Sequence, residues 1–164
     1  MLTVLIPSDS NVERLRATLT SLVPAAVDGF VTDVVITCAN REPIAALCEE
    51  LGAEIVAPSE IETKLDDVRG QWVLVLEEGA AVGPDWVAPV AAYVSTETTP
   101  ARLRSTEKDR SFWRWLRGSP KRPLRAGYLV PKAMAKSQLR NASIEALPVG
   151  RRANVAEATV IPRD

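Results

Sequence analysis

The stretch LTVLIPSDSN, residues 2–11, decides the fold class of this chain. Residues 2–6 are a short apolar run that Pro7 ends, which predicts a strand buried in a parallel sheet. A polar loop follows, and Asn11 is a typical N-cap for a helix whose apolar residues recur at helical spacing. We expect this helix to end near Pro24. A strand followed directly by a helix is the first unit of an α/β sheet.

The same order of strand and helix repeats through the first half of the chain. Three further strands are predicted at 34–36, 54–57 and 72–76, because each is a short apolar run. The helices that follow these strands are expected to begin at Pro43, Ser59 and Pro84. Such alternation is typical of a parallel, doubly wound sheet with right-handed crossovers.

The second half of the chain is polar and basic, and its order is less regular. We expect a Thr-rich loop after Ser95, a strand over 126–130, a short helix from Pro131 and a terminal strand near 158–161. A chain of 164 residues has the length of one domain with one core. The sequence therefore predicts a single α/β domain over residues 1–164, with a Rossmann-type, mostly parallel sheet flanked by helices.

The composition excludes several kinds of catalytic site. The chain has no histidine, which excludes Ser-His and Cys-His nucleophiles, His-ligated zinc and a histidine general base. Cys38 and Cys48 lack CxxC spacing, so we expect buried, reduced thiols. No apolar run has the length of a membrane span, and the N-terminus lacks the features of a signal peptide. These observations predict a cytoplasmic protein.

Charge is divided unevenly along the chain. Residues 1–100 hold 5 Lys+Arg and 16 Asp+Glu, a net charge of −11, whereas residues 101–164 hold 15 and 5, a net charge of +10. One interpretation is a dipolar surface, or an anionic partner that faces the basic third. The other is that the two parts neutralise each other across the fold.

Several segments together resemble a family 2 glycosyltransferase, a family with the GT-A fold. They are the opening 2–7, the helix residues 13–22, the strand 34–36, the stretch RGQWVLVL at 69–76 and GPDWV at 83–87. The last two resemble the region around the family's metal-binding DxD motif. Beyond residue 93, GYLVPK at 127–132 resembles the acceptor-side strand, and 150–152 the turn before the final strand.

The resemblance implies a donor, an acceptor and separate binding roles for the two halves of the chain. The donor is a nucleotide sugar, bound by a nucleotide-binding half at 1–94. The acceptor meets a basic, acceptor-side half at 95–164, and relatives in the family often act on polysaccharide or lipid-linked acceptors.

The family's acidic motifs are only partly present. The DxD position holds Glu77-Glu78-Gly79, with a carboxylate at its first place and none at its third. The resemblance implies a divalent metal, Mn or Mg, on Glu77 and Glu78, bound weakly because a hard cation needs several oxygen ligands. No Glu-Asp pair is found where the family places its catalytic base, and Glu145 lies near that place.

Four further residues are candidates for donor binding. Asp9 follows the first strand, in reach of a ribose or nucleobase, and Asn40 stands in the segment that holds these groups in the family. Lys64 and Arg69 precede the fourth strand and would neutralise a diphosphate. Plainer interpretations are a turn residue for Asp9 and surface cations for Lys64 and Arg69. For Glu77 and Glu78 the plainer interpretation is a solvated turn.

The segment Phe112–Arg117 combines aromatic and basic side chains, with Lys121, Arg122 and Arg125 nearby. Its first interpretation is a cover for the sheet, with apolar groups packed inward and arginines in solvent. The second is an interfacial helix on anionic lipid, which would place the protein at the inner face of the membrane. We expect no nucleic-acid partner, because no nucleic-acid-binding signature accompanies the charge.

Two functional hypotheses follow. The first is a nucleotide-sugar-dependent glycosyltransferase with degenerate DxD and base motifs. The second is a catalytically inactive, glycosyltransferase-like chain that serves as a binding or scaffold module, with a membrane surface among its targets. Loss of acidic motif residues on a retained scaffold keeps both hypotheses open.

Overall fold

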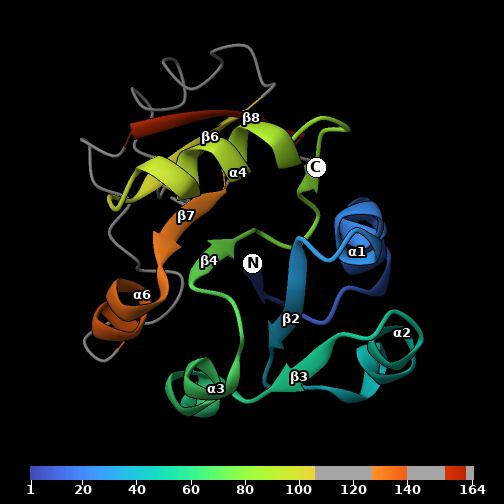
Figure 1. Ribbon diagram of the computed structural model, residues 1–164. Helices are drawn as coiled ribbons and strands as arrows, with labels where there is room; N and C mark the ends of the chain where they lie inside the picture. Colours follow the sequence, from blue (N-terminus) through green and yellow to red (C-terminus); the bar gives the residue numbers. More distant parts are fainter. Residues whose placement is uncertain (106–126, 140–153, 162–164) are drawn as a thin grey trace, which may run out of the picture.

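The computed structural model describes residues 1–105, 127–139 and 154–161, and its central feature is one mixed sheet (Figure 1). The strands are β1 (Leu2–Pro7), β2 (Val31–Thr37), β3 (Glu54–Val56), β4 (Trp72–Val75), β5 (Ala81–Val82), β6 (Ala101–Ser105), β7 (Tyr128–Pro131) and β8 (Asn154–Ile161). Within the described residues, they form an 8-stranded sheet in the order β3-β2-β1-β4-β7-β6-β8-β5. The α/β class expected from the sequence is confirmed.

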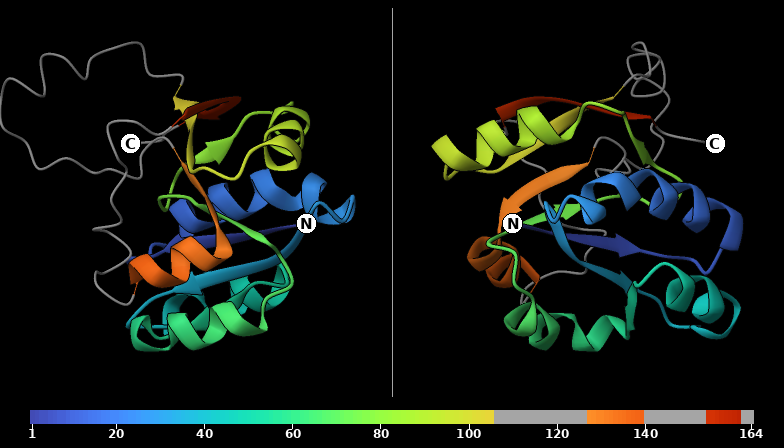
Figure 2. Two further views of the ribbon diagram at one scale, coloured as in Figure 1. Left: turned by 60° about the vertical axis from the view of Figure 1, so that its left-hand side comes forward. Right: turned by 45° about the vertical axis from the view of Figure 1, so that its right-hand side comes forward.

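Helices cover both faces of this sheet (Figure 2). They are α1 (Val12–Val27), α2 (Ala45–Glu50), α3 (Ile61–Asp67), α4 (Val87–Thr96) and α6 (Lys132–Leu139), with short 3-10 turns at Glu42–Ile44 and Pro58–Glu60. Side chains of α1, α2 and α4 share one buried cluster, and those of α3 and α6 share the other. The sheet therefore lies between two helical layers.

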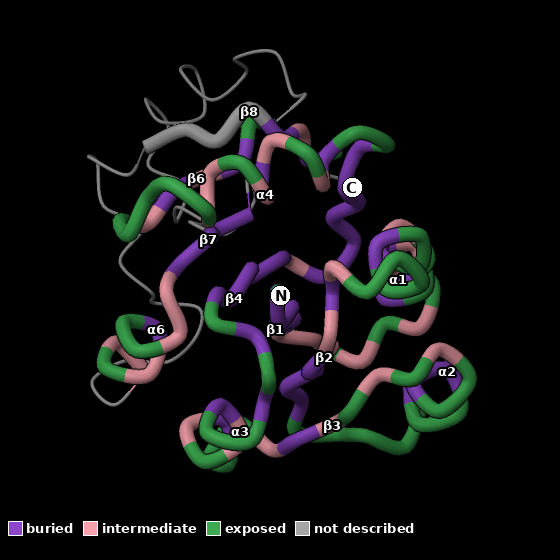
Figure 3. The backbone as a smooth tube through the Cα atoms, in the orientation of Figure 1, coloured by how far each residue is buried: buried purple, intermediate pink, exposed green. Residues whose placement is uncertain are grey.

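Strand β1 shows why the sequence produces this arrangement. Leu2, Val4 and Ile6 join the cluster under α1, whereas Leu5 joins the cluster over α3, because successive side chains of a strand point to opposite faces. A strand buried on both faces must be apolar throughout. The buried centre of the backbone in Figure 3 coincides with β1 and β4.

The direction of the strands changes across β4. Strands β2 and β4 both pair in parallel with β1, and β3 pairs in parallel with β2. Strand β7 pairs antiparallel with β4, and β6 pairs antiparallel with β7. The four parallel strands are those of the first half of the chain, so their carboxyl ends share one edge, here called the carboxyl edge.

Three helix starts and ends differ from expectation. Helix α1 continues past Pro24 to Val27, because the proline loses only one backbone hydrogen bond and Ala25 beyond it is buried in the core. Ser59 does not cap a helix; it lies inside the 3-10 turn, and the Glu60 carboxylate accepts from the Ala57 N–H at 3.0 Å. Helix α4 begins at Val87 rather than at Pro84.

Two strands were not expected from the sequence. Strand β5 has two residues, too few for a periodic pattern, and it pairs with β8. Strand β6 alternates apolar and basic residues within a stretch expected to be a loop, and buried Leu103 belongs to the core. Pairing with distant strands determines the strand conformation of both segments.

The helices that the structure describes are all too short or too polar to span a membrane.

Candidate functional site at the carboxyl edge

Three loops meet at the carboxyl edge, one after each of β1, β2 and β4. The Ser10 hydroxyl, after β1, donates to the Asn40 carbonyl oxygen, after β2, at 2.5 Å. The Asp9 N–H donates to Oε2 of Glu78, after β4, at 3.3 Å. The structure therefore brings Asp9, Asn40 and the Glu77-Glu78 pair together, as the order of strands predicts.

Glu78 is buried and hydrogen-bonded from several sides. The exposed fraction of this residue is only 5%. Its Oε1 accepts from the Ser8 hydroxyl at 2.6 Å and from the Asn11 N–H at 3.1 Å, while Oε2 accepts from the Asp9 N–H at 3.3 Å. A carboxylate offers about four lone-pair positions, so three are engaged within the protein.

Helix α1 holds the loop after β4 in place. The buried Thr18 hydroxyl accepts from the Gly79 N–H at 2.9 Å, and the Ser21 hydroxyl accepts from the Val82 N–H at 3.2 Å. Asn11, at the start of the same helix, bonds Glu78. Thr18 follows Asn11 by seven residues and precedes Ser21 by three, so the three residues lie on one side of the helix, against this loop.

The remaining candidates at the edge are accessible. Asp9 and Asn40 are exposed, and Glu77 is half-buried. The Asn40 Oδ1 accepts from the Glu42 N–H at 3.3 Å, which orients the side-chain amide. Exposed polar groups on three adjacent loops are suited to hydrogen bonding a polar ligand that lies across the strand ends.

The described residues at this edge do not fit a divalent cation held by the protein alone. Among them, no three acidic, cysteine or histidine side chains gather as a metal site. Glu78 is engaged by internal donors, and the third DxD place is Gly79. Mn²⁺ and Mg²⁺ require several oxygen ligands, and Glu77 by itself supplies too few.

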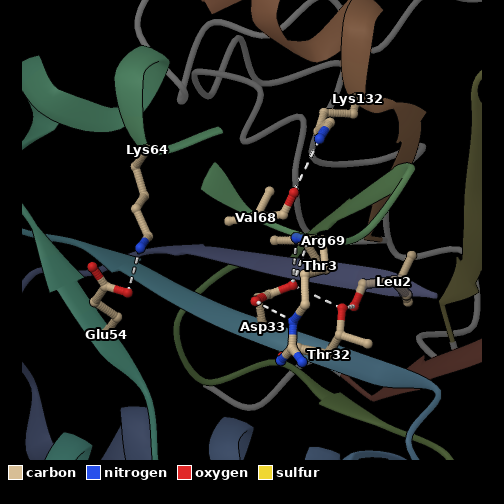
Figure 4. A network of polar contacts seen from close by, with 9 residues as sticks. All are labelled: Leu2, Thr3, Thr32, Asp33, Glu54, Lys64, Val68, Arg69 and Lys132. Atoms are coloured by element: carbon tan, nitrogen blue, oxygen red, sulfur yellow. Dashed lines mark hydrogen bonds and ion pairs between the residues drawn. The ribbon is translucent and has the colours of Figure 1, made fainter. Parts of the chain in front are cut away.

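Lys64, in α3, and Arg69, in the turn before β4, lie away from this edge (Figure 4). The Lys64 ammonium pairs with the Glu54 carboxylate, at the first residue of β3, at 2.5 Å. Arg69 donates from Nη2 to the Thr32 carbonyl oxygen at 2.6 Å and pairs with Asp33 at 3.4 Å. The structure does not bring these two cations to the donor loops, because their charged groups bond residues of the first part of β3 and of β2.

The Asp33 carboxylate is the centre of the polar network in Figure 4. It accepts from the Thr32 hydroxyl at 2.7 Å and from the Arg69 N–H at 3.0 Å. Burial raises the pKa of Asp33, but these hydrogen bonds and the Arg69 charge outweigh it and hold the pKa below its ordinary value of 3.8. The charged carboxylate therefore stabilises the amino end of the sheet.

The two cysteines are buried, free thiols. Burial raises the pKa of the Cys38 thiol, with an opposing hydrogen bond from Ser10 and the Arg41 charge, and Glu78 raises it further. Burial also raises the pKa of Cys48, with a smaller contribution from Cys38. Thiols with raised pKa values are poor nucleophiles near neutral pH, which supports the expectation that both are core residues.

Sequence reasoning missed two cations that stand beside the donor loops. Arg14 lies in the first turn of α1, and its buried Nε has no hydrogen-bond partner within the described residues. Arg41 directly follows Asn40, is exposed and donates to the Ile55 carbonyl oxygen at 3.4 Å. The order of strands could have indicated both arginines, because residues just after β1 and β2 share the carboxyl edge with residues just after β4.

Several candidates lie outside the described residues. They are Glu145, Phe112–Arg117, Lys121, Arg122, Arg125 and the turn at 150–152. Their roles stay predictions.

Comparison with solved structures identifies the fold, although no family model and no curated protein sequence matches the chain. Glucosyl-3-phosphoglycerate synthase of M. tuberculosis superposes with a TM-score of 0.59 and 16% identity, covering 100% of this chain and 72% of that chain. TarS 1-349 of S. aureus, in complex with UDP-GlcNAc, has a TM-score of 0.62 and 12% identity. The match covers 99% of this chain and 59% of that chain. The chain has a GT-A-like glycosyltransferase fold.

The GT-A-like neighbours also include a ligand-bound synthase. A second structure of the M. tuberculosis enzyme, with Mn²⁺, UDP and phosphoglyceric acid, has a TM-score of 0.60 and 15% identity, covering 100% of this chain and 70% of that chain. The resemblance predicted from residues 2–93 is thus confirmed at the level of the fold. The chain spans about 60% of the TarS fragment, which is longer.

Proposed function

We propose that the chain is a nucleotide-sugar-dependent glycosyltransferase whose donor binds at the carboxyl edge of β1, β2 and β4. The observation that carries this proposal is the meeting of three loops, through the Ser10–Asn40 and Asp9–Glu78 hydrogen bonds. It is supported by the GT-A-like fold, since neighbours with that fold are crystallised with UDP or UDP-GlcNAc.

The exposed groups suggest how a nucleotide sugar would be held. Asp9 and Asn40 offer acceptors and an amide donor to a ribose and nucleobase. Arg14 and Arg41 bring positive charge to the diphosphate, in place of Lys64 and Arg69. Because the carboxylates do not fit a protein-held Mn²⁺ or Mg²⁺, no step of this proposal runs through a metal.

The transfer step needs a base and an acceptor hydroxyl. The acceptor oxygen forms a bond to the anomeric carbon while the bond to the nucleoside diphosphate breaks, and the hydroxyl proton passes to a carboxylate. Glu145 is the proposed base. The basic half at 95–164 is the proposed acceptor side, for a polysaccharide or lipid-linked acceptor with anionic groups.

Donor binding is tested by thermal shift with UDP, UDP-, GDP- and ADP-sugars, each with and without Mn²⁺. A ligand at a hundred times its Kd adds about 2.7 kcal/mol to the free energy of unfolding. We expect a UDP-sugar to raise the melting temperature, and Asp9→Ala to weaken that effect. Asp28→Ala, at the exposed far end of α1, is the matched control. Flat curves with every donor would refute the proposal.

The second candidate function is a non-catalytic binding module. The internal engagement of Glu78 and the glycine at the third DxD place favour it. An assay of UDP release, with and without added acceptors, separates the two functions. Donor binding with no UDP release under any condition would support the module, whereas release above a denatured control would support the enzyme.

A cytoplasmic location, and contact with the inner face of the membrane through Phe112–Arg117, stay predictions. Co-sedimentation with anionic liposomes tests the contact, with Trp113→Ala and Trp115→Ala as the variants expected to weaken it. Protein left in the supernatant by anionic vesicles would exclude it.

A further inference from the structure

We propose that the Glu78 carboxylate is an internal anion that fills the hydrogen-bond cradle of the β1–α1 loop. Glu78 would then be a positioning residue of the donor site and not a metal ligand. The part of this inference that concerns donor affinity rests on the proposed function. The part that concerns the loop rests on the structure of the free protein alone.

The cradle consists of three donors that no regular secondary structure satisfies. They are the Ser8 hydroxyl, the Asp9 N–H and the Asn11 N–H, at 2.6, 3.3 and 3.1 Å from the Glu78 oxygens. The Ser8 hydroxyl also accepts from the Ser10 N–H at 3.0 Å, so the carboxylate organises the whole turn. Donors left without an acceptor in a partly buried site are costly.

The loop needs such an anchor because its backbone is unusual. Ser10 has φ of 67°, in the left-handed region that residues other than glycine seldom adopt. Its hydroxyl contacts the Asn40 carbonyl oxygen, which couples the loop after β1 to the loop after β2. Glu78 therefore positions Asp9 by a direct hydrogen bond. It positions Ser10, and so the Ser10–Asn40 contact, through the Ser8 hydroxyl.

Glu77 and Glu78 consequently have different tasks. Glu78 is buried, and its two oxygens accept three hydrogen bonds from the first loop. Glu77 is only half-buried at the same strand end. The pair offers a matched comparison, because two adjacent glutamates are expected to respond differently to the same substitution.

The first test is rescue of the loop by a small carboxylate. Glu78→Ala removes the anion and leaves its three donors, so we expect the melting temperature to fall by about 5 °C or more. Sodium acetate should restore about half of that fall, relative to sodium chloride at the same ionic strength. Glu77→Ala is the control, with a smaller fall and no specific acetate effect. Equal melting temperatures in acetate and chloride for Glu78→Ala would overturn the proposal that Glu78 is an internal anion.

The second test keeps the size of the side chain, in case the alanine variant does not fold. Glu78→Gln has one acceptor oxygen in place of two, so at least one donor of the cradle loses its partner. We expect the Asp9 and Asn11 amide signals in ¹⁵N NMR spectra to shift and their hydrogen exchange to quicken about tenfold. Glu77→Gln should leave both amides unchanged. Unchanged amides in Glu78→Gln would overturn the proposal.

The third test concerns the donor and separates this inference from the proposed function. Glu78→Gln should raise the Kd of UDP about tenfold, whereas Asp28→Asn should leave it unchanged. A variant that binds UDP as tightly as wild type would overturn the positioning role. A wild-type chain that binds no UDP would refute the proposed function, while the acetate and amide tests would still decide on the internal anion.

Discussion

At the scale of single residues, Gly70 shows how close packing selects one amino acid. A Cβ at this position would lie 2.5 Å from the Thr3 backbone nitrogen and 2.9 Å from the Leu2 carbonyl carbon. Backbone cannot yield as a side chain does, so we expect Gly70→Ala to lower the free energy of unfolding by about 3 kcal/mol. Urea denaturation measures this loss.

The control for that variant is another glycine with open surroundings. Gly29 has φ of +73° and nothing within 4 Å of an added Cβ, so Gly29→Ala should lose only about 1 kcal/mol through backbone strain. An equal loss for both variants would show that the contact with β1 does not determine the choice of glycine at position 70.

Asp33 gives the stability a dependence on pH. Its folded-state pKa is depressed below 3.8, so its contribution is complete above that value and is lost as the pH falls through the folded-state pKa. We expect Asp33→Asn to lower the free energy of unfolding by about 2 kcal/mol at pH 7. The difference from wild type should stay constant between pH 5 and 7 and shrink below pH 3.8. Melting curves across this range measure it, and a difference that grows with acid would contradict the assignment.

At the scale of elements, the face of α1 that carries Thr18 decides where the loop after β4 lies. Thr18→Val keeps the shape but removes the acceptor of the buried Gly79 N–H, so we expect a loss of about 2 kcal/mol. Thr20→Val makes the same change at an exposed position of the same helix and should alter stability by less than about 0.5 kcal/mol. Chemical denaturation compares the two, and similar losses would show that the helix, rather than the loop contact, responds.

At the scale of the whole molecule, one sheet joins both core clusters and should unfold with them in one transition. Leu5 and Leu15 are fully buried, each in a different cluster. We expect Leu5→Ala and Leu15→Ala each to lower the free energy of unfolding by about 3 kcal/mol, and each to move the entire transition. Far-UV circular dichroism and tryptophan fluorescence should give the same midpoint. A variant that moves one signal and leaves the other would divide the molecule into two units.

Local sequence patterns are sufficient to predict the parallel half of the fold and the edge at which the candidate site lies. Apolar runs such as 2–6 and 72–76 allow burial on both faces, and residues that follow them must share an edge. The same patterns predict that Asp9, Asn40 and Glu77 lie at one edge. It also predicted the buried state of Cys38 and Cys48.

Tertiary contacts set the mixed half of the sheet, where β6 pairs in parallel with β8 and antiparallel with β7, and they set the separate tasks of the two glutamates. Strand β5 is too short for a periodic pattern and the alternation of β6 covers only five residues, so both depend on β7 and β8 as pairing partners. Glu77 and Glu78 are chemically identical in the sequence. Their difference arises because Ser8, Asp9 and Asn11, 67 to 70 positions earlier, donate to the buried Glu78 carboxylate, whereas Glu77 is half-buried. Contacts between distant segments carry no local signal, which is why the sequence alone assigned both to a metal.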